Sequence, residues 1–447
     1  MHTNFNRVVN PSLQQHIRAS EVLTGSDSIH HQWECLDLDV ACLVLDKLLE
    51  SIDRASFRVV CKEWGRLARA YRRLCKPKVL PMLLIPADNH HYYGKKNSRQ
   101  SLETIMHQGL LYSVSKRRIY RRVQSIMLPS LGEPEPETRY SRYYRGCGHG
   151  WVAMIDTDVI FGSETIITLV NPFTTVILPS LPPLKRYNSG IPKVILSEDP
   201  TSNPDHYVVV AFADDYASMD FIKGRQGWYH IDCRPYLAEP DDYNFTDAIF
   251  YGGQIYMADS YYGIIAVFDY KSKQQVYLEK IYTPPPPAAR DESERAYLVE
   301  SINGDIFYIR RLTTSGYYSD LTKSFRVFKV VLNGSTVEHV EVKSIGDEAL
   351  FVGDSHSLSF LASSSSGCQP NSIHFTDDSI NFSKYLDNYI RRVITIKCYE
   401  DEDEDEYQVR ADTGIFHLED GTISRYYLKC FDDDLLPPAF WIIPPAF

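Results

Sequence analysis

The sequence predicts a small all-α module followed by a large all-β domain. Two changes in pattern along the chain support this division. Apolar residues recur at helical spacing up to about residue 76, whereas later segments are short runs rich in Tyr, Val, Ile and Phe. Gly, Asn, Asp and Pro separate those runs. We therefore divide the chain into a polar leader (residues 1–32), a helical module (33–76) and a β domain (78–447).

Three short helices are predicted in the helical module. The first spans Val40–Leu49, where apolar residues follow a helical stripe. Asp53 is the predicted N-cap of a second helix that carries Phe57 and Val60. The third helix has one apolar face and one face rich in arginine: Trp64, Leu67, Ala68, Tyr71 and Leu74 against Arg66, Arg69, Arg72 and Arg73. A unit of this size cannot bury all its apolar surface, so some must pack on the β domain or on a partner.

The β domain shows repeated strand and hairpin signals. Apolar and β-branched runs occur at YVVVAFA from Tyr207, GIIAVFDY from Gly263, DIFYIRRL from Asp305 and FRVFKVVL from Phe325. Tight turns are predicted at Gly252-Gly253, Asn303-Gly304, Asn333-Gly334 and Asp420-Gly421, because these dipeptides supply the positive φ angles that hairpins need. Many short strands at regular spacing indicate a barrel, a sandwich or a propeller.

Size distinguishes these all-β architectures. Residues 78–447 are too many for one sandwich, and at roughly 40 to 55 residues per blade they supply about six to eight propeller blades. Two tandem sandwiches remain a less favoured alternative. A propeller is stable when strands from both chain ends complete one blade. We therefore expect Val79–Ile85 and Phe440–Pro444 to lie in the same or adjacent blades.

Composition excludes several classes of protein. Apolar residues make up 44% and charged residues 23% of the chain, as in a globular protein. The net charge of −11 argues against a general nucleic-acid binder. No apolar run is long enough to predict a membrane-spanning helix, and residues 1–20 lack a secretory signal. Nine cysteines without a CxxC pair indicate reduced thiols, as in the nucleus or cytoplasm.

No catalytic, metal or cofactor site is predicted. Cys147 and His149 share one face of a strand, but no acidic residue is implied beside them. The adjacent carboxylates Asp214-Asp215 and Asp377-Asp378 would point to opposite faces of a strand. Neither a phosphate-binding GxxxxGK[ST] loop nor an HExxH zinc motif is present. A glycosidase built from carboxylates of two different blades remains open.

The helical module contains the motif FRVVCKEW, Phe57–Trp64, which follows Leu36 and the first helix. In this motif and its distance from Leu36, the module resembles the F-box. Asp37 stands where the family usually has proline, which predicts a less rigid turn before the first helix. The alternative is an ordinary helical cap that matches by chance. The resemblance implies docking on the Skp-type adaptor of a cullin–RING ubiquitin ligase, through Leu36, Val40, Leu43, Leu48, Phe57, Val60, Cys61 and Trp64.

Six segments of the β domain are distinctive in sequence and order: His149–Asp156, Leu169–Pro183, Asp247–Asp259, Tyr297–Arg311, Ser344–Asp378 and FWIIP from Phe440. In these segments the β domain is similar to the KIB-type β-propeller that follows the F-box in many plant proteins. The resemblance implies a non-catalytic adaptor that brings a protein substrate to the ligase. A glycan-binding or hydrolytic propeller and a ligase-independent scaffold are the alternatives.

Substrate recognition is expected on loops at one rim of the propeller. The distinctive loops are Tyr187–Pro192, Pro284–Glu294 and the acidic run Glu400–Glu406, which is either a solvated loop kept extended by self-repulsion or a binding segment for a basic substrate. Candidate substrate-binding residues are Tyr261, Tyr262, Tyr317, Tyr318, Glu402 and Glu404. The alternative for the tyrosines is packing between blades. A basic stretch could bind phosphate or direct nuclear import, or could be the exposed side of a strand: Lys116, Arg117, Arg118, Arg121 and Arg122.

Overall fold

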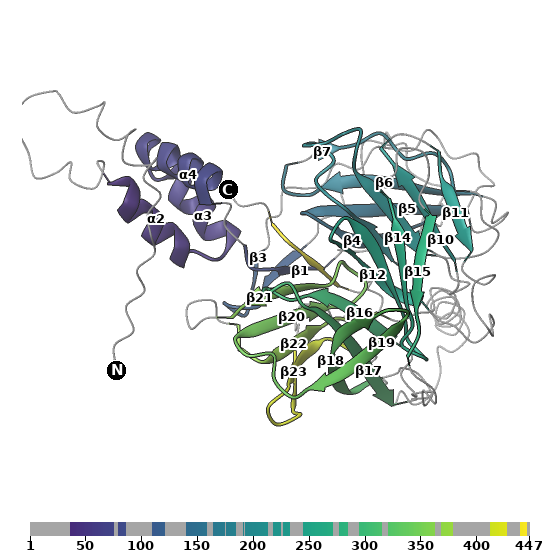
Figure 1. Ribbon diagram of the computed structural model, residues 1–447. Coiled ribbons are helices and arrows are strands. Elements are labelled where there is room, and N and C mark those ends of the chain that lie inside the picture. The colour runs from purple at the N-terminus through teal and green to yellow at the C-terminus, as the bar shows by residue number, and fades with distance from the viewer. Residues whose placement is uncertain are drawn as a thin grey trace, which may run out of the picture.

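A computed structural model describes the helical module and most of the β domain (Figure 1). The described residues are 36–75, 79–85, 110–120, 140–158, 164–174, 176–184, 191, 193–212, 218–224, 227–232, 245–270, 277–284, 295–314, 321–362, 368–378, 412–426 and 439–444. The predicted leader, residues 1–32, lies outside them.

The helical module consists of α2 (Leu38–Lys47), α3 (Ser51–Val59) and α4 (Lys62–Cys75). Ala41, Leu45, Phe57, Leu67 and Tyr71 form its buried core. The three predicted helices are confirmed, although the first begins and ends two residues earlier than predicted.

The predicted N-cap at Asp53 is wrong. Helix α3 begins at Ser51, its N-cap residue is Glu50, and Asp53 lies in the first turn. The cause is tertiary, because the Glu50 side chain makes no capping hydrogen bond in its own helix and contacts the β domain instead.

The described strands of the β domain form six sheets, which are the blades of a propeller (Figure 1). Six lies within the predicted range of six to eight. The first blade contains β25 (Phe440–Ile442), β1 (Met82–Ile85), β2 (Leu110–Ser113) and β3 (Arg118–Tyr120), and the second contains β4 (Tyr140–Gly148), β5 (Trp151–Asp158), β6 (Thr165–Asn171) and β7 (Val176–Ile177). The third blade contains β8 (Val194–Leu196), β9 (Val208–Phe212), β10 (Ser218–Lys223) and β11 (Tyr229–Asp232). The fourth contains β12 (Phe245–Tyr251), β13 (Gln254–Asp259), β14 (Ile265–Asp269) and β15 (Tyr277–Tyr282).

The fifth blade contains β16 (Arg295–Glu300), β17 (Ile306–Thr314), β18 (Leu321–Asn333) and β19 (Thr336–Val342). The sixth departs from the simple antiparallel pattern. Its order is β21 (Leu358–Leu361), β20 (Glu348–Val352), β22 (Ser372–Phe375), β23 (Gly414–His417) and β24 (Ile423–Arg425), with β20 and β22 parallel. Strand β21 lies beside β16 of the fifth blade, so the chain reverses from β20 to supply the innermost strand.

The two ends of the β domain meet in the first blade. Strand β25 pairs antiparallel with β1, with Leu83 opposite Trp441 and Met82 opposite Ile442. This pairing confirms the predicted closure of the ring. It leaves no unprotected strand between the first and last parts of the domain, because the last strand joins the three strands that begin it.

All four predicted tight turns connect neighbouring antiparallel strands. They link β12 to β13, β16 to β17, β18 to β19 and β23 to β24. Gly304 has a φ of +82°, a left-handed conformation that a side chain would strain. The dipeptides therefore predicted the hairpins for the correct physical reason.

Candidate functional site

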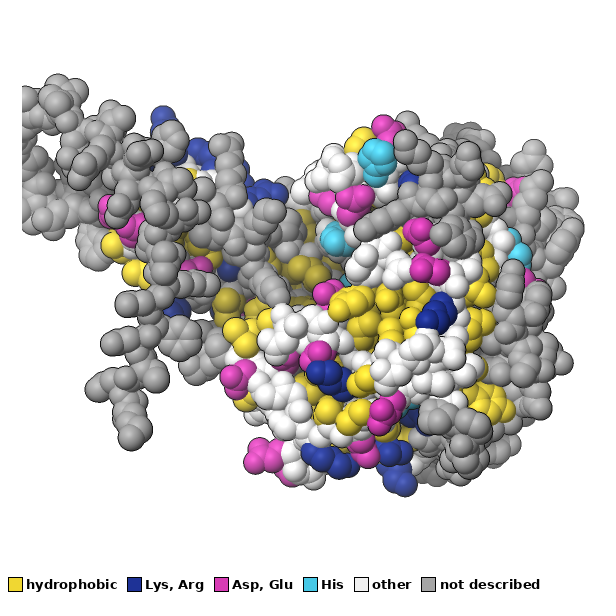
Figure 2. Space-filling model, in the orientation of Figure 1, with side chains coloured by type: hydrophobic (Ala, Val, Ile, Leu, Met, Phe, Trp, Pro, Cys, Tyr) yellow, Lys and Arg dark blue, Asp and Glu magenta, His cyan; other side chains and the backbone are white. Residues whose placement is uncertain are grey.

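Exposed aliphatic side chains gather on the helical module. Leu43 and Val44 lie one helical turn after Val40 on α2, and Val59 and Val60 lie at the end of α3. Leu43 is 67% exposed and Val60 61%. In Figure 2 hydrophobic side chains reach the surface at the α2 edge of the module, while Lys and Arg side chains follow the α4 edge. Because the module's core is complete without these five residues, they are exposed apolar side chains that a partner can cover.

The predicted docking residues divide into surface and core. Val40, Leu43 and Val60 are exposed. Phe57 is buried and stacks on Trp64, with ring centroids 4.5 Å apart. Leu36, Leu48 and Trp64 are partly buried against the module's core. The sequence pattern missed Val44 and Val59. Val44 could have been identified, because helical spacing places it one turn from Val40. Val59 could not, because its exposure depends on where α3 ends.

Cys61 has a local structural contact. It lies half-buried between α3 and α4, and its Sγ accepts a hydrogen bond of 3.4 Å from the Trp64 backbone N–H. That N–H lies in the first turn of α4, where backbone donors have no partner within the helix. The spacing of Cys61 and Trp64 in the FRVVCKEW motif therefore lets the cysteine cap the N-terminus of α4.

Asp37 caps the first helix. Its carboxylate accepts a 2.8 Å hydrogen bond from the backbone N–H of Asp39, and its backbone is extended, with φ −63°. Aspartate is among the preferred residues at this position, where a cap contributes about 1 kcal/mol. A proline would fit the φ angle but would lose the cap. The predicted loss of rigidity at this turn is therefore offset by a hydrogen bond.

The candidate substrate-binding residues of the propeller are only partly described. Tyr262 is half-buried against the core shared by the third and fourth blades, and its backbone N–H donates to Asp259. The Tyr261 carbonyl accepts a hydrogen bond of 3.3 Å from Arg310. Tyr262 therefore packs within the propeller, and Tyr261 is held there through its backbone carbonyl. Tyr317, Tyr318, Glu402 and Glu404 lie outside the described residues, as does nearly all of each of the three distinctive loops.

The basic stretch 116–122 also lies only partly within the described residues. Lys116 is paired with Asp53 of α3 at 2.5 Å, so it joins the two parts of the protein. The guanidinium of Arg118 lies 4.4 Å from the Tyr120 ring centroid. Arg121 and Arg122 lie outside the described residues.

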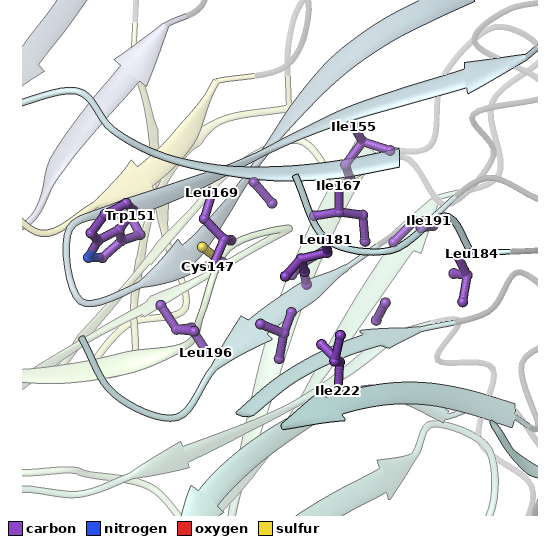
Figure 3. Close-up of a cluster of buried hydrophobic side chains, with 14 of the residues drawn as sticks. Cys147, Trp151, Ile155, Ile167, Leu169, Leu181, Leu184, Ile191, Leu196 and Ile222 are labelled. Carbon is purple, nitrogen blue, oxygen red and sulfur yellow. The ribbon is translucent and has the colours of Figure 1, made fainter. Parts of the chain in front are cut away.

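Cys147 is a core residue. Figure 3 shows it among aliphatic side chains of the second and third blades, which include Leu169 and Leu196. Burial raises the pKa of its thiol far above the ordinary value. His149, in the turn after β4, lies beside His356, with ring centroids 6.5 Å apart. The pair Cys147 and His149 is thus a buried thiol and a separate turn residue, an arrangement unsuited to nucleophilic catalysis.

Charged side chains meet at the centre of the propeller, where they are buried. Lys193, just before β8, lies 2.6 Å from Asp247 of β12 and donates to the Gly353 carbonyl at 3.2 Å. Ser357 donates to Asp247 at 2.8 Å. Gly353 and Ser357 belong to the connection between β20 and β21. That connection therefore reaches the third and fourth blades across the ring.

A second charged cluster joins the fifth and sixth blades. Arg311 of β17 contacts Asp378 at 2.5 Å and Asp412 at 2.8 Å, and all three side chains are buried. Burial raises the pKa of Asp378, but Arg311 and Arg295 outweigh it, so the net pKa is below the usual value. Paired, buried carboxylates of this kind hold blades together and are inaccessible to a glycan.

Neither a membrane-spanning helix nor a metal cluster occurs in the described part of the chain. None of its helices has the length and apolarity needed to cross a bilayer. Within the same residues, no group of three or more His, Cys, Asp or Glu side chains is arranged to hold a metal ion.

Comparison with known proteins agrees with this architecture. An Arabidopsis thaliana protein provisionally named an F-box protein is 23% identical over 370 residues, which cover 80% of this chain and 92% of that protein. A second F-box protein of the same plant is 32% identical over 140 residues, 30% of this chain and 40% of that protein. A third is 42% identical over 60 residues, 13% of this chain and 16% of that protein.

Solved structures align weakly. An exo-β-1,3-galactanase from Phanerochaete chrysosporium aligns with a TM-score of 0.30 at 8% identity, over 53% of this chain and 56% of the enzyme. An alignment this weak carries no argument about function.

A profile of the KIB1-4 beta-propeller family matches residues 111–408, well over half of the chain. The chain therefore belongs to the KIB1-4 beta-propeller family, as the order of its sequence segments predicted.

Proposed function

We propose that the helical module is an F-box that docks on the Skp-type adaptor of a cullin–RING ubiquitin ligase, and that the propeller presents a protein substrate. In this role the chain catalyses nothing. It raises the effective concentration of the substrate near the ubiquitin-charged enzyme of the ligase. The names of the similar plant proteins support this function, as does the motif Phe57–Trp64.

One observation carries the proposal: exposed Val40, Leu43, Val44, Val59 and Val60 on a module with its own core. Burying one such aliphatic side chain contributes about 1.5–3 kcal/mol relative to leaving it exposed. A few anchors of this kind account for most of the affinity of an interface. The exposed valines and leucine therefore suit an apolar groove of an adaptor.

Charge placed on this surface should prevent docking. We expect Leu43→Asp combined with Val60→Asp to abolish co-purification of the Skp-type adaptor, since a carboxylate buried without a partner costs several kcal/mol. Both side chains are largely exposed, so the free module should stay folded. Leu36, which packs against the core, is a less specific target because its truncation would also destabilise the module.

Val340→Asp is the matched control. Val340 is 43% exposed on the fifth blade, far in sequence from the module, and its replacement should leave adaptor binding intact. The test is quantitative pull-down of the adaptor and cullin with the full chain. Retention of the adaptor by the Leu43 and Val60 double variant would contradict the proposal. Adaptor binding without cullin would instead favour a ligase-independent scaffold.

A hydrolytic or glycan-binding propeller is the second candidate. Such a function requires carboxylates that converge on an accessible cleft. The central carboxylates described here, Asp247, Asp354 and Asp378, are buried and have cationic partners at 2.6, 3.6 and 2.5 Å. This pairing favours the adaptor function.

For substrate capture we propose the acidic run Glu400–Glu406 with Glu402 and Glu404, together with Tyr317 and Tyr318. Seven consecutive acidic residues would attract a basic substrate segment. Replacing them with Gln and Asn should weaken capture of the ligase's substrate, most strongly at low salt, while adaptor binding stays unchanged. Substrate recovery should be measured at two salt concentrations. Equal recovery at low salt would show that recognition lies elsewhere.

A further inference from the structure

The helical module is held on the first blade by direct contacts. The backbone N–H of Leu80 donates to the carbonyl of Leu49 at 3.0 Å. Leu49 packs on the core between the first and sixth blades, and Ile52 packs on the core between the first and second. Figure 1 shows α3 beside the first blade, with β1 and β3 nearest to it. Helix α4 ends at Cys75 and β1 begins at Met82, so the connection between the two parts is also short.

Glu50 lies at the middle of this joint. Its side chain is 3% exposed, and it accepts hydrogen bonds from Ser113, Ser115 and Tyr120, the last at 2.9 Å. Lys116 lies 3.5 Å from the same carboxylate. Four side chains of one hairpin thus converge on a single carboxylate of the helical module.

A second ion pair borders the first. Lys116 also contacts both oxygens of Asp53, at 2.5 and 2.6 Å. Burial by itself raises the pKa of Glu50, but the three hydroxyl donors and Lys116 outweigh it, and the net pKa is below the usual value. The carboxylate is therefore ionised near neutral pH. Charge-assisted hydrogen bonds of this kind are directional and about twice as strong as neutral ones.

We infer that Glu50 is a positioning residue that sets the orientation of the adaptor-docking helices relative to the propeller. The inference rests on the proposed function, because orientation matters only if one part docks on the ligase and the other holds its substrate. Apolar contacts of Leu49 and Ile52 bring the two parts together but do not select one angle. The buried carboxylate does, since its donors come from three fixed positions on the β2–β3 hairpin.

The consequence is a fixed distance between the bound substrate and the ligase's catalytic subunits. A joint that rotates freely would spread the substrate over many positions and lower the effective concentration at the reacting centre. Glu50 thus acts on ubiquitin transfer without touching either partner.

Distance measurement within the full chain tests this role. Labels at Arg69 on α4 and Glu338 on β19, both exposed, would be introduced as non-natural amino acids so that native cysteines stay unlabelled. We expect one narrow distance distribution in the natural protein. Glu50→Ala should broaden it, because three hydroxyl donors and Lys116 lose their shared acceptor. Ser115→Asp should broaden it from the propeller side, by placing a second carboxylate against Glu50.

Glu63→Ala is the matched control. Glu63 lies on α4, and within the described part of the chain its ion pair is with the exposed Arg66, at 2.6 Å. It should leave the distribution narrow. Adaptor affinity should change by less than about twofold in all three variants, since none of these residues is in the docking surface. A narrow distribution in both joint variants, or a loss of stability without broadening, would overturn the role of Glu50. Failure of the natural protein to bind the adaptor would overturn the proposed function instead, and leave the distance result intact.

Discussion

Deleting residues 439–447 is expected to abolish cooperative folding of the whole propeller. Strand β25 supplies one edge of the first blade and lies beside β4 of the second, so its loss opens the ring at that point. Phe440, Trp441 and Ile442 are all buried. Their removal would expose apolar surface on both sides of the first blade and leave β1 with an unpaired edge. Urea unfolding followed by circular dichroism would show the loss as an absent or non-cooperative transition.

A point variant of Trp441 tests how much this one side chain of β25 contributes to the stability of the propeller. Trp441 packs against Phe351 and His374, with ring centroids 5.0 and 6.2 Å away, and its Nε1 donates to the Val352 carbonyl at 3.1 Å. Trp441→Ala should lower the free energy of unfolding by about 3–5 kcal/mol. Trp441→Phe keeps an aromatic ring but leaves the Val352 carbonyl without this donor, so it should cost about 1–3 kcal/mol.

Trp228→Ala is the matched control for this experiment. Trp228 also donates its Nε1 to a carbonyl, that of Pro182 at 2.6 Å, but it lies at the partly exposed edge of its cluster. Its truncation should therefore be the less costly of the two. If both alanine variants lost the same stability, closure by β25 would not be the main restraint on the ring.

Replacement of Arg311 by methionine is expected to destabilise the propeller by about 3–5 kcal/mol at neutral pH, because it leaves a buried carboxylate without its main cation. Arg311 joins Asp378 and Asp412 and donates to Tyr297 at 3.1 Å and to the Thr376 carbonyl at 2.9 Å. These partners come from both the fifth and the sixth blade. Chemical denaturation with a single chain-wide transition would measure the loss.

The pH dependence of that loss follows from Asp378. Arg311 and Arg295 hold the folded-state pKa of Asp378 below the ordinary aspartate value of 3.8. The ionised carboxylate therefore stabilises the natural protein above that ordinary pKa, and this contribution disappears as the pH falls through the folded-state pKa. The difference between the natural protein and Arg311→Met should therefore narrow under acid. Arg326→Met, which removes an exposed pair with Glu341 at 3.1 Å, should cost less than about 1 kcal/mol. A similar loss in both variants would contradict the importance of burial.

Local patterns in the sequence predicted most of the architecture. Helical spacing identified the three helices, short apolar and β-branched runs identified strands, and the four turn dipeptides identified hairpins. These signals are local, because apolar periodicity and turn dipeptides are read within a single helix, strand or turn. The F-box resemblance named eight docking residues, of which Val40, Leu43 and Val60 are exposed and Phe57 lies in the module's core.

Long-range polar contacts could not be predicted in this way. Glu50 is bonded to Ser113, 63 residues away, and Lys193 to the Gly353 carbonyl, 160 residues away. In sequence, each is an ordinary charged residue, and Asp53 was the more plausible helix cap. The parallel pairing of β20 and β22 is similarly hidden, because apolar runs do not specify their partners.

The sequence by itself therefore determined the types of element, the hairpins and the two-part organisation of this protein. Only the tertiary structure decided which aliphatic side chains of the module remain exposed, how the ring's charges pair, and how Glu50 joins the module to the first blade. The physical reason is that secondary structure depends on neighbouring residues. Burial and ion pairing depend on which distant segments the completed fold brings into contact.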